Sequence, residues 1–223
     1  MHQVQSVPWH EVIGINGQFG LPTQVLDACR STSLRIGGPR LTTVGVTSAI
    51  RGEGRSMVAQ ALALIQANDY RRRVVLLELD LENPALAEQL RLAARPGLAE
   101  LAQGSSAMSE VLQPFGPRLA AITAGASLPA AGAGILEQLR GGVLRAVQQE
   151  ADVVVMDLPP LITSPYGRQA AQMAEQLVMV IRAGITPLPR VKEAIDSVSP
   201  APAILLNGVH SSLPRWMQTL LSV

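Results

Sequence analysis

Short, uninterrupted apolar runs separated by amphipathic stretches dominate the chain. The runs are rich in leucine and β-branched residues, and this is the pattern of strands that are covered on both faces of a parallel sheet. Strands are predicted at residues 41–47, 73–79, 119–123, 152–157, 177–182 and 203–206. Helical spacing is found at residues 56–67, 133–149, 166–175 and 191–198. This alternation predicts an α/β fold with a doubly wound, mostly parallel sheet flanked by helices.

The two ends of the chain differ from this central part. Residues 1–20 show no clear period and are expected to form an N-terminal tail, whereas residues 21–34 are expected to form a helix that leads into the sheet. Residues 21–209 are predicted to be one domain and residues 210–223 a C-terminal tail. No apolar run approaches the roughly 20 residues of a membrane span, and no secretion signal is evident. The sequence therefore predicts a cytoplasmic protein.

Composition narrows the function classes. Of 223 residues, 48% are hydrophobic and 16% charged, which provides material for a core and argues against disorder. The net charge of +1 gives no electrostatic reason to expect nucleic acid as a partner. The single cysteine, Cys29, excludes an internal disulfide and a cysteine-based zinc site. Lys192 is the only lysine, so any chemistry that needs a lysine elsewhere must use another residue.

A glycine-rich segment after the first predicted strand, AIRGEGRS, indicates a phosphate-binding loop. Gly52 and Gly54 would let backbone amides approach phosphate oxygens at the start of a helix, and Ser56 stands where a hydroxyl coordinates magnesium. Arg55 stands where the template has lysine, and its longer, forked guanidinium makes the exchange non-conservative. The alternative is a turn retained only for packing. The predicted nucleotide-binding residues are Ala49, Gly52, Glu53, Gly54, Arg55, Ser56 and Met57.

Carboxylates follow two other predicted strands. Glu78 and Asp80 come at the end of one strand, and Asp157 ends another. Ligands of open α/β sheets bind at the carboxyl ends of the strands, so these side chains are expected to converge on the glycine-rich loop. Ser56 and Asp157 are the predicted magnesium ligands, directly or through water. The alternative role for Asp80 and Asp157 is to cap a turn or helix, and which of Glu78 and Asp80 faces the site is left open.

Taken in order, these motifs resemble the cytoplasmic P-loop domain of bacterial tyrosine kinases, which are paired with chain-length regulators in capsule and exopolysaccharide export. More distantly they are similar to the MinD and ParA group of ATPases. The resemblance covers about residues 22–209 through VTSAIRGEGRSMVAQALA, RVVLLELDLENP, ADVVVMDLPP and ILLNGV. It implies a P-loop NTPase fold with residues 49–56 as the Walker A element and Asp157 as the Walker B aspartate. It also implies that Glu78 and Asp80 form the Asp-x-Asp element and that Asn207 lies near the adenine.

The departures from the family pattern fall where the chemistry would take place. Arg55 replaces the Walker lysine, Glu78 is one methylene longer than the family's aspartate, and Glu82 reverses the charge of an arginine. The family also has a cluster of tyrosines near its C-terminus, which is missing here. Its oligomer motif, Glu-x-x-Arg-x-x-Arg, survives only in part, as Asp27, Arg30 and Ser33.

These departures lead to the hypothesis of a pseudoenzyme: a tyrosine-kinase-like protein with weak or absent catalysis that regulates or scaffolds exopolysaccharide biosynthesis and export. Two alternatives stay open. One is an active ATPase or autophosphorylating tyrosine kinase in which Arg55 clamps the phosphates and Glu78 or Asp80 helps to activate the nucleophile. The other is a MinD- or ParA-like positioning ATPase.

The resemblance also implies ligands and partners. The cofactors would be ATP or ADP with Mg²⁺, if binding is retained. The expected partner is a cytoplasmic segment of a membrane polysaccharide chain-length or export protein, which would bring the chain to the inner membrane as a peripheral component. A homo-oligomer is a further alternative.

Overall fold

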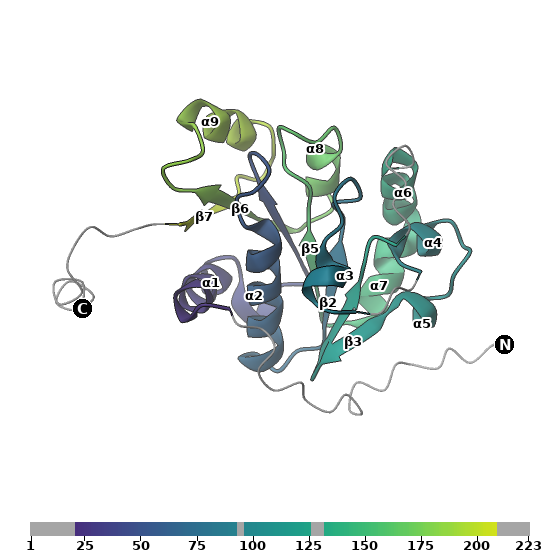
Figure 1. The fold of residues 1–223 in the computed structure, drawn as a ribbon. Coiled ribbons are helices and arrows are strands. Elements are labelled where there is room, and N and C mark those ends of the chain that lie inside the picture. The colour runs from purple at the N-terminus through teal and green to yellow at the C-terminus, as the bar shows by residue number, and fades with distance from the viewer. Residues whose placement is uncertain (1–20, 93–95, 126–131, 209–223) are drawn as a thin grey trace.

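The computed structural model describes residues 21–92, 96–125 and 132–208 and contains a seven-stranded sheet with helices on both faces (Figure 1). The strand order is β3-β4-β2-β5-β1-β6-β7, and every neighbouring pair is parallel except β3 and β4. The predicted α/β fold is therefore confirmed. The strands are Thr43–Ser48 (β1), Val74–Glu78 (β2), Gln113–Gly116 (β3), Leu119–Ile122 (β4), Val153–Asp157 (β5), Gln176–Arg182 (β6) and Ala203–Asn207 (β7).

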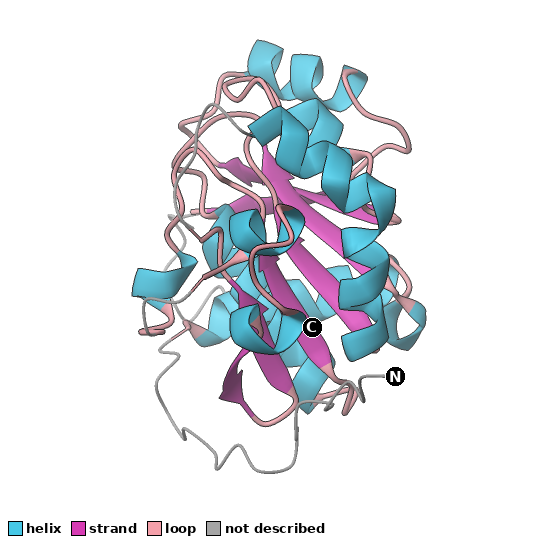
Figure 2. Ribbon diagram, turned by 90° about the vertical axis from the view of Figure 1, so that its right-hand side faces the viewer, coloured by secondary structure: helices cyan, strands magenta, loops and turns pink. Residues whose placement is uncertain are grey.

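Helices cover both faces of this sheet (Figure 2). The α-helices are Thr23–Arg35 (α1), Arg55–Asn68 (α2), Leu86–Gln89 (α3), Leu98–Ala102 (α4), Met108–Val111 (α5), Gly132–Gln138 (α6), Leu144–Glu150 (α7), Gly167–Ala171 (α8) and Leu188–Asp196 (α9). A π-helical turn, Leu139–Val143 (η3), joins α6 to α7, and a 3₁₀ turn, Gly38–Arg40 (η1), follows α1.

Three helix predictions need correction. The expected helix over residues 133–149 is broken because Gly142 has a φ of 147°, which is outside the helical range. The helix expected over residues 166–175 ends at Ala171 as α8. The helix expected over residues 191–198 is shifted, because α9 starts directly after Pro187 and takes another proline into its first turn, where a missing N–H costs nothing.

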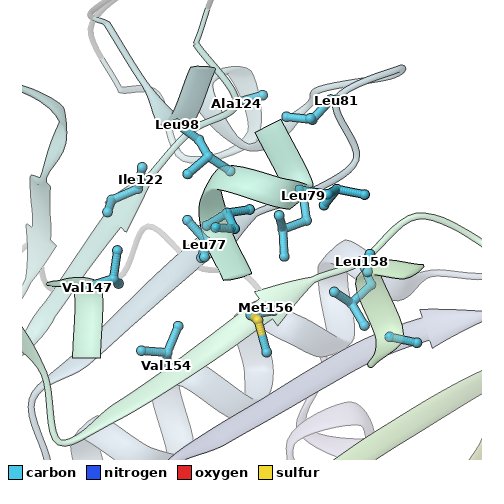
Figure 3. Close-up of a cluster of buried hydrophobic side chains, with 14 of the residues drawn as sticks. Leu77, Leu79, Leu81, Leu98, Ile122, Ala124, Val147, Val154, Met156 and Leu158 are labelled. Carbon is cyan, nitrogen blue, oxygen red and sulfur yellow. The ribbon is translucent and has the colours of Figure 1, made fainter. Parts of the chain in front are cut away.

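The core consists of two apolar layers, one on each face of the sheet. Successive residues of a strand point to opposite faces, so Leu76 lies in the layer under α1 and α2, whereas Leu77 lies in the layer under α4, α6, α7 and α8. Figure 3 shows this second layer, where Leu77, Val154 and Met156 meet Leu98 and Ile122. Every residue of β1, β2, β4 and β5 is buried. The carboxyl ends of these central strands are therefore held on a packed scaffold.

The predicted domain limits are not tested by this structure. The two predicted tails, residues 1–20 and 210–223, lie outside the described residues. Within the described part of the chain, no helix is long and apolar enough to cross a bilayer.

Candidate nucleotide-binding site

The loop between β1 and α2 has the backbone of a phosphate cradle. Gly52 and Gly54 have φ values of 79° and 94°, a left-handed conformation that side-chain-bearing residues rarely adopt. α2 begins at Arg55, so the unpaired amides of its first turn face the loop. A pocket of about 370 Å³ opens beside it, lined by Gly52, Gly54, Arg55, Ser56, Met57, Gln60 and Gln89. Five of the seven predicted nucleotide-binding residues of the loop thus line one pocket.

Two residues of this pocket were missed by the sequence analysis. Gln60 lies on α2, and its side-chain amide donates to the Oε1 of Gln89 on α3 at 2.6 Å. The pair forms a polar wall outside the glycine-rich loop. Gln60 is part of a predicted helix, but nothing in the sequence marks its contact with Gln89, because α3 is one turn long and was not predicted.

Glu53 and Asn207 brace the loop from the β6 and β7 side. The Glu53 side chain is buried, and its carboxylate accepts from the backbone amides of Ile50, at 2.8 Å, and Arg182, at 3.1 Å, and from the Thr186 hydroxyl. The side-chain amide of Asn207 donates to the Glu53 carbonyl at 2.9 Å. The hydrogen bonds of Glu53 therefore stabilise the conformation of the loop, and Asn207 lies against the loop backbone.

Arg55 points into the protein and is bonded there. Its Nη2 lies 2.8 Å from the Asp80 carboxylate, its Nη1 donates to the Leu158 carbonyl at 2.9 Å, and the residue is only 9% exposed. The same Asp80 oxygen also accepts from Arg51 at 3.3 Å, and Arg51 pairs with Glu82 at 2.9 Å. Two arginines and two carboxylates thus tie the phosphate loop to the segment after β2. Glu82, the charge reversal noted in the sequence, has its counter-charge in Arg51.

Asp157 and Ser56 meet at the centre of the site. Asp157 ends β5 between β1 and β2, it is only 2% exposed, and its side chain is hydrogen-bonded to that of Ser56. The carboxylate oxygen Oδ1 is buried and has no hydrogen-bond partner among the described residues. Burial raises the pKa of Asp157 to about 7, although the Ser56 hydrogen bond and the Arg55 charge oppose the rise. This carboxylate is therefore poised to take up a proton or a cation near neutral pH.

The Ser56 and Asp157 oxygens fit the preference of Mg²⁺ for hard oxygen ligands, and the unpaired Oδ1 of Asp157 would serve as one such ligand. Within the described residues, no group of three His, Cys, Asp or Glu side chains could hold a metal ion by itself. A magnesium ion here would complete its shell with phosphate oxygens and water, as Mg²⁺ usually does in nucleotide sites.

Glu78 accepts hydrogen bonds from the backbone around the site. Its Oε1 accepts from the amides of Ala85 and Leu86 at the start of α3, the latter at 2.8 Å, and its Oε2 accepts from Ala124 after β4 at 2.9 Å. Both oxygens of this buried side chain are thus bonded to main-chain N–H groups. Of the two acidic residues at the end of β2 and just after it, the structure brings Asp80, and not Glu78, into contact with the phosphate loop.

The remnant of the oligomer motif on α1 is bonded within the chain. Arg30 pairs with Asp27 at 3.0 Å and with Asp69 at 2.8 Å. Ser33 is buried and accepts from the side-chain amide of Gln66 at 3.0 Å.

A glycine-rich loop that leads from a buried strand into a helix, with a carboxylate at the end of the adjacent parallel strand, is the arrangement of the P-loop NTPase fold. Solved structures agree with this assignment. The kinase domain of VpsO has a TM-score of 0.73 and 23% identity, with 84% of this chain and 96% of that chain covered. The kinase domain of the Escherichia coli tyrosine kinase ETK has a TM-score of 0.76 at 19% identity, covering 96% and 85%. MinD from Pyrococcus horikoshii, solved with Mg-ADP, has a TM-score of 0.63 at 17% identity, covering 82% and 78%.

Sequence comparison leads to the tyrosine kinases as well, although no family model matches the chain. The tyrosine-protein kinase YwqD of Bacillus subtilis is 25% identical over 174 residues, which are 76% of this chain and 72% of that protein. The succinoglycan biosynthesis transport protein ExoP of Rhizobium meliloti is 26% identical over 171 residues, which are 73% of this chain but only 21% of that protein. The resemblance to bacterial tyrosine kinases, with MinD as a more distant structural neighbour, is therefore confirmed.

Proposed function

We propose that this chain is a tyrosine-kinase-like P-loop protein with weak or absent catalysis that acts as a regulatory or scaffolding partner in exopolysaccharide biosynthesis and export. The observation that carries this proposal is the position of Arg55. The cation that would clamp the phosphates is bonded to Asp80 and to the Leu158 carbonyl, inside the protein.

The energetics of these contacts support weak phosphate binding. A hydrogen bond to a charged group contributes about 1.5–3 kcal/mol, and Arg55 would have to give up such bonds in order to reach a phosphate. Phosphoryl transfer depends on positioning and charge stabilisation, so it is sensitive to the loss of a free cation. Asp80 is already paired with two arginines, and Glu78 is bonded to three backbone amides. The three predicted catalytic residues, Arg55, Glu78 and Asp80, are thus all engaged in bonds within the protein.

Some nucleotide binding is compatible with the proposal. The amides of residues 52–56 would face the phosphates of ATP or ADP, and Ser56 and Asp157 would hold the accompanying Mg²⁺. The ion would neutralise phosphate charge when bound. We infer that any such binding is weak, because the loop lacks a free cation to add to these contacts.

An active ATPase or autophosphorylating tyrosine kinase is the second candidate, and the retained Ser56–Asp157 pair favours it. Mg-ATP hydrolysis and tyrosine phosphorylation by the purified protein separate the two, with Asp157→Ala as the control. The pseudoenzyme proposal expects both proteins to remain at background. Turnover by the wild type that Asp157→Ala abolishes would establish the active alternative. A MinD-like positioning ATPase has only the shared fold in its favour.

The proposed role in polysaccharide export comes from the relatives, one of which is named a succinoglycan biosynthesis transport protein. We propose that the partner is a cytoplasmic segment of a membrane polysaccharide chain-length or export protein, and that this segment holds the chain at the inner membrane. A deletion strain complemented with wild type, Arg55→Ala or Asp157→Ala tests the scaffolding role. All three should restore polymer yield. Folded, stably expressed variants that fail to restore it would show that catalysis or nucleotide binding is required.

A further inference from the structure

Exposed apolar side chains gather at one edge of the sheet. Within the described residues, five large hydrophobic side chains are exposed, and four of them lie on β7 or between the end of β6 and the start of α9. We call these four residues the β7 patch: Ile185, Leu188, Ile204 and Leu206. Their exposed fractions run from 39% for Ile204 to 80% for Leu188. Apolar residues grouped in this way, in contrast to single exposed ones, mark an interaction surface.

The two faces of β7 are covered unequally. Leu205 is buried in the layer under α1 and α2, and α1 contacts β7. Ile204 and Leu206 point to the other face, where the parallel register sets them beside Met179 and Ile181 of β6. Met179 and Ile181 are buried in the layer to which α9 contributes Ala194. β7 itself is an edge strand that keeps apolar side chains in water, a feature that native proteins usually cover or charge.

We propose that the C-terminal segment of this same chain, residues 213–221, packs on the β7 patch as a short amphipathic helix. Its sequence, LPRWMQTLL, places apolar residues at positions i, i+3, i+4, i+7 and i+8, which is one face of a helix. These residues are Leu213, Trp216, Met217, Leu220 and Leu221. An isolated helix of this length is unstable in water, so it needs an apolar surface on which to form.

The length of the connection favours this occupant over a second copy. Gly208 follows β7 directly, and four residues separate it from Leu213, so the segment starts at most about 20 Å from the end of the strand. A nine-residue helix is about 14 Å long, close to the roughly 16 Å of five strand residues in β7. A short link of this kind gives an effective concentration in the millimolar range. Another copy of the chain would compete poorly at lower concentrations.

Tryptophan fluorescence of the full chain tests the proposal. The chain has two tryptophans, Trp9 and Trp216, so Trp9→Phe leaves Trp216 as the only reporter. We expect its emission to be shifted to the blue, and its quenching by iodide to be weaker, relative to a free peptide of residues 209–223. Adding Leu206→Ser should move both values to those of the peptide. Leu34→Ser is the matched control, because Leu34 is a 66% exposed leucine on α1, over the opposite face of the sheet, and should change neither value.

Three outcomes would overturn the proposal. Trp216 fluorescence equal to that of the peptide in the Trp9→Phe protein would show that the segment is undocked. Burial that grows with protein concentration, together with a larger mass by light scattering, would identify a second copy as the occupant. Burial only after addition of phosphatidylglycerol–phosphatidylethanolamine vesicles would identify a membrane surface. If circular dichroism shows that Leu206→Ser is unfolded, Leu220→Ser replaces it as the test, because this substitution changes the segment and leaves the sheet intact. Iodide quenching of Trp216 that is unaltered in Leu220→Ser would refute docking.

Discussion

Replacing Asp157 with asparagine should remove a pH-dependent cost to folding. The pKa of this carboxyl is raised from 3.8 to about 7, with burial as the main cause. Between these values the folded protein keeps the proton and the unfolded chain loses it. The contribution of this group to stability is therefore most favourable below about pH 4, falls as the pH rises toward 7, and stays constant above that.

The magnitude follows from the size of the pKa change. A rise of about three units, at 1.36 kcal/mol each, corresponds to about 4 kcal/mol of stability lost between about pH 4 and pH 8. Asparagine does not titrate, but its amide N–H would point to where Oδ1 has no partner, which costs about 1–3 kcal/mol at every pH. The variant should thus be more stable than wild type by about 1–3 kcal/mol near pH 8 and less stable by a similar amount near pH 4.

Urea unfolding of both proteins across this pH range measures the effect. The expected signature is a crossing of the two stability curves, because only the wild type carries the titrating carboxyl. A free-energy difference between the proteins that is the same at about pH 4.5 and pH 8 would refute the reasoning, and it would mean that Asp157 is ionised in the folded protein throughout.

Three further changes follow from individual contacts. Asp152→Asn should have the opposite pH dependence, because a hydrogen bond from Arg73 lowers the pKa of Asp152. The exposed Arg73–Asp152 pair should make the wild type more stable than the variant by roughly 0–1 kcal/mol at neutral pH, and urea unfolding should show that this difference vanishes at acid pH. Asp80→Ala should cost about 3–5 kcal/mol in urea unfolding, since it leaves the buried Arg55 without its carboxylate, and a loss below 1 kcal/mol would contradict the buried pair. Gly45→Ala should lower stability by about 1–3 kcal/mol in thermal or urea unfolding, because the new methyl would lie 2.5 Å from a leucine side chain; an unchanged midpoint would argue against this close packing.

The sequence predicted six of the seven strands because each is a short, continuous apolar run, and it placed the glycine-rich loop because its residues are adjacent in the chain. β3 escaped prediction, since it has four residues, includes Pro114 and pairs only at the sheet edge. The end of α8 also depends on tertiary structure. There, the backbone amide of Glu175 donates to the Thr43 hydroxyl, and the chain passes directly into β6.

The site was harder to predict than the fold because its side chains find partners far along the sequence. Arg55 and Asp80 are 25 residues apart, and their bond depends on the direction that each side chain takes. The sequence likewise presented Glu82 as a bare charge reversal, although Arg51 compensates it. Glu78 could be placed at the end of a strand, but its reach to the amides of α3 and to Ala124 required the surrounding loops.

Calorimetric titration of wild type and Arg55→Lys with Mg-ADP tests most directly whether Arg55 is withheld from the phosphates. Lysine cannot reproduce the two separate bonds that Arg55 makes to Asp80 and the Leu158 carbonyl, and it has the point charge that suits a phosphate clamp. The predicted result is weak or undetectable binding by wild type and tighter binding by the lysine variant. Tight binding by wild type that weakens in Arg55→Lys would contradict the account, because Arg55 would then be the phosphate ligand.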